Sequence, residues 1–273
     1  MADTNNGEAY IGGAALLDLI PQVAVGSTRI LDFGCGNGST LMRLKKERGC
    51  TELYGVDIRK SYEAELKEKL DEAWIMDLGE PDIELDDKYL YYFNYILMLD
   101  VVEHLYDPWY VLPKVARYLA PSGKLIISVP NFRNWGLWFN VVLGEFSYGK
   151  PGGIMNEEHI RWFTFDSLKE LIAMSGLVLR SAQLTFPPNV DIAMMRERVK
   201  TPIAELEIPP PETKDEVRKT TIRFAGITDI SAQYPYFLAN KIIAICGREE
   251  TITVPEPILE GALEERRKRL SKR

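Results

Sequence analysis

Three glycines within five positions follow an apolar run near the start of the chain. They are Gly34, Gly36 and Gly38, in the stretch ILDFGCGNGST. A residue without a Cβ can adopt a positive φ and lets another molecule approach the main chain closely. The apolar run is typical of a buried strand, so the glycines form a strand-to-helix turn, where open parallel sheets bind ligands. The sequence therefore predicts a small-molecule site at this turn.

The glycine spacing and an adjacent acid disfavour a dinucleotide as the ligand. The fingerprint GxGxxG would place its third glycine at position 39, where this chain has a serine. Asp32 lies in the strand just before the turn, and a carboxylate there suits a ligand amine better than a pyrophosphate. Asp32 could also accept hydrogen bonds from the turn itself. Cys35, within the turn, is interpreted as a small space-filling residue rather than a nucleophile.

Two more acids end the next two predicted strands. Asp57 closes the stretch LYGVD and could bind the diol of a ribose. Asp77 lies in AWIMDLG, and with the apolar residue after it could meet the amino group and ring of an adenine. Together with Asp32, these acids indicate a nucleoside site that lacks a phosphate binder.

Alternating strand-like and helix-like segments predict the elements that position these residues. The alternation is typical of an α/β fold, a Rossmann-like parallel sheet covered by crossover helices. Strands are predicted at 29–33, 52–57, 73–77, 93–99, 124–129, 177–185 and 237–246. Helices are predicted at 39–48, 61–71 and 109–119, and at 165–176, where Asp166 or Ser167 is the expected N-cap.

The same pattern predicts the domain organisation. Residues 1–28 are expected to form an N-terminal helix or cap. The core is expected to comprise 29–186 and 235–248, with an aromatic lid over the substrate at 131–164. Residues 187–234, rich in proline and charge, are interpreted as an insertion that acts as a lid, a homodimer contact or a loop. Residues 249–273 form a charged tail.

Composition narrows the partners and the compartment. The 273 residues include 40 acidic and 33 basic ones, and the net charge of −7 argues against nucleic acid as the main ligand. Neither a signal peptide nor a membrane span is predicted. Three cysteines without metal-type spacing fit a reducing cytosol. A cytoplasmic protein that acts on a small molecule is therefore expected.

The two histidines of the chain are the candidate catalytic bases. His159, in EEHIRWF, is expected near the substrate, as a general base or substrate-orienting group, or merely as a hydrogen-bonding group of its loop. His104 follows the fourth strand and could instead hold that turn. Asp100, Glu103 and His104 have i, i+3, i+4 spacing, so a divalent ion such as Mg²⁺ is a less favoured alternative to a metal-free site.

Aromatic residues gather after the fifth predicted strand. Trp135, Trp138 and Trp162 could line the acceptor pocket by stacking on a sugar or ring, or could pack the lid.

Four stretches resemble the successive motifs of class I S-adenosylmethionine-dependent methyltransferases. They are ILDFGCGNG, LYGVDI, WIMDLG and LDVVEHLYDPWYVLPKVARYLAPSGKLIISVPN, and the resemblance covers residues 29–179. It implies that family's seven-stranded fold and S-adenosylmethionine as the cofactor. The implied cofactor contacts are Asp32, Phe33, Gly34, Cys35, Gly36, Gly38, Asp57, Ile58, Asp77, Leu78, Leu99 and Asp100.

The later segment narrows the expected substrate only loosely. PNFRNWGLWFNVVLGEFSYG and EEHIRWFTFDSLKELIAMSGL resemble a subgroup that includes ubiquinone-type and sugar or natural-product O-methyltransferases and the methionine-biosynthesis W-type proteins. The expected reaction is methyl transfer to a hydroxyl of a sugar or another natural-product or glycan precursor. One alternative is a non-catalytic module that binds the cofactor for regulation or assembly. A nicotinamide-dependent oxidoreductase or epimerase is a further alternative, disfavoured by the missing later glycine.

Overall fold

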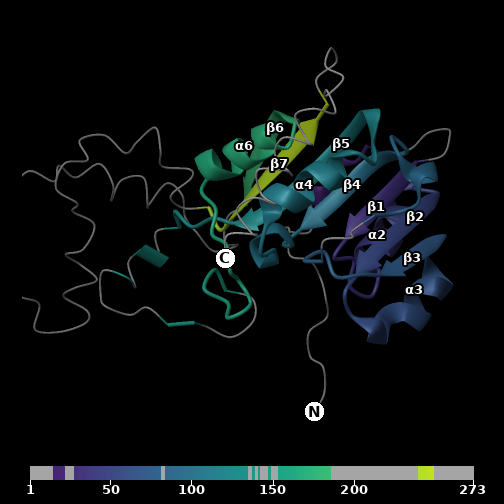
Figure 1. The fold of residues 1–273 in the computed structure, drawn as a ribbon, viewed down its shortest axis with the longest axis horizontal. Helices are drawn as coiled ribbons and strands as arrows, with labels where there is room; N and C mark the ends of the chain where they lie inside the picture. Colours follow the sequence, from purple (N-terminus) through teal and green to yellow (C-terminus); the bar gives the residue numbers. More distant parts are fainter. Residues whose placement is uncertain are drawn as a thin grey trace, which may run out of the picture.

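Seven strands form a single sheet in the order β3-β2-β1-β4-β5-β7-β6 (Figure 1). The computed structural model describes residues 15–21, 28–80, 84–134, 137–138, 141, 147–148, 153–185 and 239–248. The strands are β1 (Arg29–Phe33), β2 (Glu52–Asp57), β3 (Glu72–Ile75), β4 (Phe93–Leu99), β5 (Leu119–Pro130), β6 (Val178–Thr185) and β7 (Lys241–Gly247). Pairs among β1 to β5 are parallel, and β7 is antiparallel to both β5 and β6. The predicted seven-stranded, mostly parallel sheet is confirmed.

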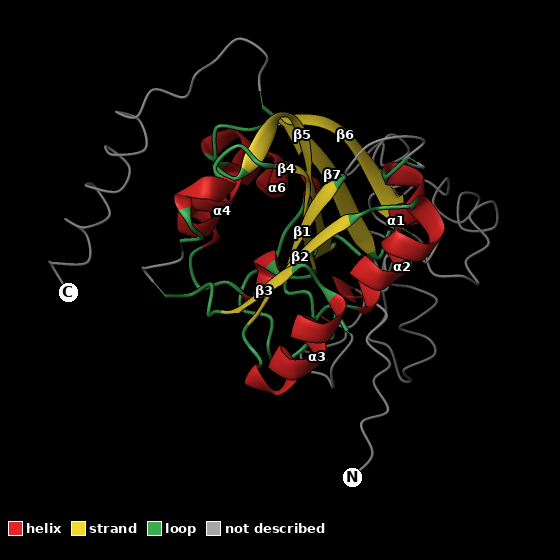
Figure 2. Cartoon of the chain, turned by 90° about the vertical axis from the view of Figure 1, so that its right-hand side faces the viewer, coloured by secondary structure: helices red, strands yellow, loops and turns green. Residues whose placement is uncertain are grey.

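Helices cover both faces of this sheet. The α-helices are α1 (Ala15–Leu19), α2 (Ser39–Arg48), α3 (Glu63–Lys69), α4 (Pro108–Ala116) and α6 (Phe165–Met174), and the short 3₁₀ turns are η1 (Lys60–Tyr62), η2 (Asp87–Tyr89) and η3 (Val102–His104). Figure 2 shows α4 and α6 on one side of the sheet and α1 and α2 on the other. Because helices cover both faces of the sheet, its parallel strands are buried on both sides and carry apolar residues on both faces.

Alternation along β4 shows how one strand serves two cores. Ile96 and Met98 pack in the core under α4 and α6, whereas Leu97 and Leu99 pack in the core under α1, α2 and α3. Successive side chains of a strand point to opposite faces, so each core receives every second residue. Side chains outside the two cores, and therefore available to a ligand, are expected at the ends of the strands.

Several predicted boundaries match the structure. β1, β2, β4 and α2 have the predicted bounds, and Gly49 ends α2 with a φ of 73°. Pro108 begins α4 after Asp107, whose side chain accepts a hydrogen bond from the backbone N–H of Tyr110. Residues typical of turns and helix ends, such as Gly49 and Pro108, flank these segments, so their limits could be predicted from the sequence.

Other boundaries differ because tertiary pairing decides them. The helix predicted to reach Leu119 ends at Ala116, since Leu119 pairs with Phe93 and begins a β5 longer than predicted. β3 ends at Ile75, the last residue that pairs with β2. The N-cap of α6 is Thr164, which exchanges hydrogen bonds with Ser167 in a capping box, so the prediction of Asp166 or Ser167 was wrong by a few residues.

Parts of the predicted organisation lie outside the described residues. These are the insertion at 187–234, the tail at 249–273, Trp135 and parts of the segments at 1–28 and 131–164. Across the described ranges, no helix is both long and apolar enough to cross a lipid bilayer.

Candidate active site

The glycine turn lies at the carboxyl end of β1, beside the end of β2. Gly34, Gly36 and Gly38 have φ values of 77°, 58° and 79°, in the left-handed region that only glycine adopts at little cost. The backbone N–H groups of Gly34 and Cys35 both donate to the Val56 carbonyl, at 2.7 and 3.0 Å. A Cβ at Gly34 would lie 2.6 Å from Val101 Cγ2, so the turn also packs closely against Val101.

Asp57, the last residue of β2, faces this turn. Its side chain is 3% exposed, and its Oδ2 accepts the backbone N–H of Gly36 at 2.7 Å. Its Oδ1 accepts the Nε–H of Arg59 at 3.0 Å. Burial raises the pKa of Asp57, but the hydrogen bonds from Arg59 and Gly36 outweigh burial and lower the pKa overall. The structure therefore presents an ionised carboxylate beside the turn.

Asp32, one residue before the end of β1, is also buried. Burial first, and then the negative charge of Asp57, raise the pKa of Asp32 to about 8. Burial and the same two acids raise the pKa of the Cys35 thiol, so Cys35 is a neutral packing residue, as interpreted from the sequence. Asp57 is paired with Arg59, so a positively charged group that binds here would favour the ionised form of Asp32.

The remaining predicted cofactor residues lie nearby but in different environments. Asp77 is exposed two residues beyond β3, and its Oδ1 accepts the N–H of Gly79 at 2.7 Å. Leu78 is buried in the core, whereas Ile58 is one of the exposed large apolar residues, with 60% of its surface accessible. Phe33 is fully buried in the core under α4 and α6, so only its main chain is available to a ligand.

The end of β4 has an unusual backbone. Asp100 directly follows Leu99 and has a φ of 55°, which a non-glycine residue adopts only under constraint. Its Oδ1 accepts the hydroxyl of Ser128 at 2.9 Å, and its Oδ2 accepts Nζ–H of Lys241. β5 and β7 therefore hold Asp100 in place.

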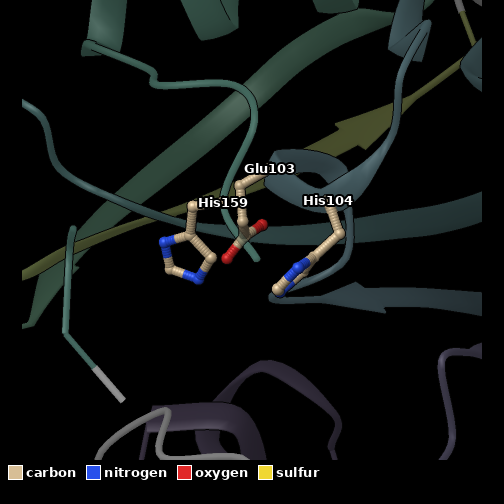
Figure 3. Close-up of side chains that lie close together, drawn as sticks. All are labelled: Glu103, His104 and His159. Atoms are coloured by element: carbon tan, nitrogen blue, oxygen red, sulfur yellow. The ribbon is translucent and has the colours of Figure 1, made fainter. Parts of the chain in front are cut away.

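Three side chains converge just beyond β4. Glu103 and His104 belong to η3, and His159 comes from the segment before α6; one ligand atom of each lies within 4.8 Å of the others. Figure 3 shows the Glu103 carboxylate close to both imidazole rings, which contact each other edge to face with their centroids 4.7 Å apart. The backbone N–H groups of Ile160 and Arg161 both donate to the Glu103 carbonyl at 3.0 Å, which fixes the two segments together. The structure thus brings His159 into one cluster with Glu103 and His104.

Hydrogen bonds determine where the free nitrogens of this cluster are. His104 Nδ1 lies 3.1 Å from the Glu158 carbonyl, and His159 Nδ1 lies 3.0 Å from the Ile154 carbonyl. A carbonyl can only accept, so each Nδ1 carries a hydrogen, and Nε2 of a neutral ring keeps a lone pair. Burial lowers the pKa of His159, so it is neutral at pH 7 and can accept a proton.

Glu103 is the most buried member of the cluster. It is 1% exposed, and neither of its carboxylate oxygens has a hydrogen-bond partner among the described residues. Burial and then the charge of Asp100 raise its pKa well above the usual value for a glutamate. A buried carboxyl without a partner is costly unless it serves a proton or a cation.

Of the predicted acceptor pocket, two tryptophans lie in the described part of the chain. Trp138 and Trp162 are partly exposed, and both contact Phe132, with ring centroids 5.7 and 6.1 Å from its ring. Trp138 Nε1–H donates to the Phe132 carbonyl at 2.9 Å.

Sequence reasoning missed two residues that shape the site, Arg59 and Lys241. Arg59 stands two positions after the acid that ends β2, a spacing that could have drawn attention to it. Lys241 lies 141 residues from Asp100, and nothing in the local sequence signals the contact.

Comparison with known proteins finds similarity to methyltransferases. Residues 11–182 match the family described as methyltransferase domain. A ubiquinone biosynthesis O-methyltransferase of Bradyrhizobium diazoefficiens is 31% identical over 122 residues, 44% of this chain and 46% of the relative. The 27-O-demethylrifamycin SV methyltransferase of Amycolatopsis mediterranei is 27% identical over 111 residues, 37% of this chain and 38% of the relative. The chain thus spans about half or less of these curated relatives.

A solved structure shares the fold over most of the chain. The S-adenosylmethionine-dependent methyltransferase of Archaeoglobus fulgidus superposes with a TM-score of 0.54 and 20% identity, covering 88% of this chain and 94% of that one. The family match includes the glycine turn, the three strand-end acids and η3. The chain belongs to the methyltransferase domain family and has the Rossmann-like fold of class I S-adenosylmethionine-dependent methyltransferases.

Proposed function

We propose that this protein transfers the methyl group of S-adenosylmethionine to an oxygen atom of a small molecule. The observation that carries the proposal is the placement of two different sites along one edge of the sheet. The glycine turn with Asp32 and Asp57 lies at the ends of β1 and β2, and a pair of imidazoles with free Nε2 atoms lies beyond the end of β4. β1 and β4 are parallel neighbours in the sheet, so both sites lie at the same edge of the sheet, where open parallel sheets bind ligands.

The cofactor fits the first site by charge and shape. The ammonium of its methionine part is placed near Asp32, and its carboxylate near the backbone N–H groups at the start of α2. The ribose diol is placed at Asp57, and the adenine at Asp77 and Leu78. The left-handed backbone at Gly36 and Gly38 gives the turn the shape that the cofactor would approach.

The reaction itself is an in-line displacement. The acceptor oxygen attacks the methyl carbon, the carbon–sulfur bond breaks, and its electron pair stays on sulfur to give S-adenosylhomocysteine. The hydroxyl proton of the acceptor passes to Nε2 of His159, which is neutral at pH 7 because burial lowers its pKa. His104 lies against His159 and orients the acceptor from the other side.

Oxygen as the acceptor atom is supported by the names of two relatives and by the base. The ubiquinone biosynthesis relative is an O-methyltransferase by name, and the rifamycin relative methylates a 27-O-demethyl compound by name. Trp138 and Trp162 provide aromatic surface for a ring or a sugar. We propose a sugar or another natural-product precursor as the acceptor.

We infer a second role, cation binding, for the acceptor-side cluster of Glu103, His104 and His159, because no hydrogen-bond donor among the described residues reaches its carboxylate. Two imidazole lone pairs and a buried carboxylate converge, and the structure gives the carboxylate no hydrogen-bond partner within the described ranges. Such a set fits a divalent cation, and two imidazoles suit Zn²⁺ or Mn²⁺ better than the Mg²⁺ considered from the sequence. Glu103, His104 and His159 would hold the ion. When bound, the ion would supply Lewis acidity to a hydroxyl.

One set of measurements tests the function and separates the two roles. The chain is incubated with methyl-labelled S-adenosylmethionine and a panel of catechols, sugars and nucleotide sugars, and transfer of label to oxygen is followed by mass spectrometry. Binding of S-adenosylhomocysteine without transfer to any acceptor would favour a non-catalytic module. Tighter binding of a nicotinamide cofactor than of S-adenosylhomocysteine would contradict the proposal.

The variant His159→Gln addresses the base. We expect turnover to fall about a hundredfold while the affinity for S-adenosylhomocysteine stays unchanged, because glutamine cannot accept the proton. Unchanged turnover would remove His159 from the reaction. A chelator should leave the wild type active if His159 acts alone. If activity is lost and Zn²⁺ or Mn²⁺ restores it, metal analysis of the wild type and of Glu103→Gln shows whether this cluster holds the ion.

A further inference from the structure

The side chain of Arg59 folds back onto the carboxylate that ends β2. Asp57 Oδ1 accepts the backbone N–H of Arg59 at 2.9 Å and its Nε–H at 3.0 Å. Asp57 Oδ2 accepts the N–H of Gly36 at 2.7 Å and Nη2–H of Arg59 at 3.3 Å. The carboxylate therefore receives four hydrogen bonds, two from the main chain and two from one guanidinium.

These four bonds use the full accepting capacity of the group. An ionised carboxylate has about four lone-pair sites, so an additional ligand must replace an existing donor. The N–H groups of Gly36 and Arg59 belong to the fixed turn and strand end, and cannot leave without rearranging the backbone. The two guanidinium bonds are the ones that a ligand diol can replace.

The guanidinium also occupies the space that the glycine turn leaves open. Its Nη2 lies 3.3 Å from the point where a Cβ of Gly36 would be. The face of the Tyr62 ring supports it, with Arg59 Cζ 4.5 Å from the ring centroid. The Arg59 side chain is 55% exposed, so it can swing outward without disturbing the core.

We propose that the Arg59 side chain occupies the ribose subsite. It pairs with Asp57 when no cofactor is bound, and the cofactor's 2′,3′-diol must displace it. The inference rests on the proposed function, in which Asp57 binds the ribose. Its consequence is weaker binding and faster release of the nucleoside product. Because the Asp57–Arg59 pair must break on binding, Arg59 reduces cofactor affinity by the strength of that pair.

The test compares Arg59→Ala with a matched control. Partly exposed ion pairs are worth up to about 1 kcal/mol, which corresponds to a two- to fivefold change in affinity. We therefore expect Arg59→Ala to bind S-adenosylhomocysteine about two to five times more tightly by calorimetry, with a slower dissociation rate. Lys60→Ala removes the same charge from the next, exposed residue and should bind like the wild type. Arg59→Lys keeps the charge but loses the paired guanidinium bonds, so its affinity should be intermediate.

Salt dependence gives a second readout that a general loss of stability would not produce. Salt screens the partly exposed pair, so raising it from 0.05 to 0.5 M, about a threefold shorter screening length, should bring the wild type closer to Arg59→Ala. Equal or weaker binding by Arg59→Ala, in a variant whose melting temperature is unchanged, would overturn the inference. Asp57→Ala separates this from a failure of the function: if it still binds S-adenosylhomocysteine like the wild type, Asp57 is not the ribose ligand and the inference about Arg59 falls, whereas the proposed methyl transfer is decided by the label-transfer assay.

Discussion

We expect cofactor binding to release a proton from Asp32 in the wild type, and the variant Asp32→Asn to lack this proton release. Asp32 is buried at the end of β1, and burial together with the charge of Asp57 raises its pKa to about 8. At pH 7 the empty protein therefore carries this carboxyl mostly protonated. A bound ammonium favours the ionised form, so binding is expected to release the proton.

The size of the effect follows from the pKa. With a pKa of about 8, the ionised fraction of Asp32 is about 1% at pH 6, about 10% at pH 7 and about half at pH 8. If the bound state needs the ionised form, affinity for S-adenosylhomocysteine rises about fiftyfold between pH 6 and pH 8, and about 0.9 proton is released at pH 7. Asp32→Asn has no such proton, so its affinity should be low and nearly independent of pH.

Calorimetry measures both quantities. S-adenosylhomocysteine is titrated at pH 7 in phosphate and in Tris, whose ionisation enthalpies differ, and again at pH 6 and 8. Glu47→Gln, which removes an exposed acid of α2, is the control and should behave like the wild type. Equal proton release and an equal pH slope in the wild type and in Asp32→Asn would refute the role given to Asp32.

The same proton affects stability without ligand. An aspartate in an unfolded chain loses its proton near pH 4, whereas Asp32 in the folded chain keeps it to about pH 8. Between these values the folded state binds more protons than the unfolded state, so this residue makes the free energy of unfolding fall as pH rises. Chemical denaturation of Asp32→Asn from pH 5 to 8 should show a smaller fall than the wild type.

Two substitutions test the backbone that holds the site. Gly34→Ala should lower the free energy of unfolding by about 1–3 kcal/mol, because it forces a positive φ and a contact with Val101; Gly153→Ala, whose Cβ would meet nothing within 4 Å, should have little effect in the same urea titration. Lys241→Met should lower it by about 1–3 kcal/mol, because the partly buried Asp100 loses its charged donor, and full stability of that variant would show the ion pair to be unimportant.

The fold was largely predictable because its signals are local. β1, β2 and β4 are short apolar runs, and the first two are each followed by a turn or an acid. The hydrophobic pattern and the residues that end it therefore predicted the same strand limits as the structure has. The start of β5 was not predictable in this way. Pro121 and Gly123 indicate a turn, and only the pairing of Leu119 with Phe93 extends the strand across it.

The placement of acids at the strand ends was predictable for a related reason. Parallel strands place their carboxyl ends at one edge, so acids that end consecutive strands meet there whatever the helices between them do. The acceptor side depends on a contact between segments 55 residues apart. His159 reaches His104 because two backbone N–H groups that follow it bond the Glu103 carbonyl, and no spacing rule in the sequence encodes that contact.

The arrangement of charge along the edge also has a consequence for turnover under the proposed function. S-adenosylmethionine carries a positive sulfonium, and S-adenosylhomocysteine has lost it, so the attraction of the cofactor to Asp32 and Asp57 is weaker after transfer than before. Arg59 competes for Asp57 equally against both ligands, so it weakens the binding of both and speeds product release without changing the preference of the acids for the charged donor. An acidic edge with one displaceable cation thus holds the methyl donor and releases the product, provided that the acids are ionised when the donor binds.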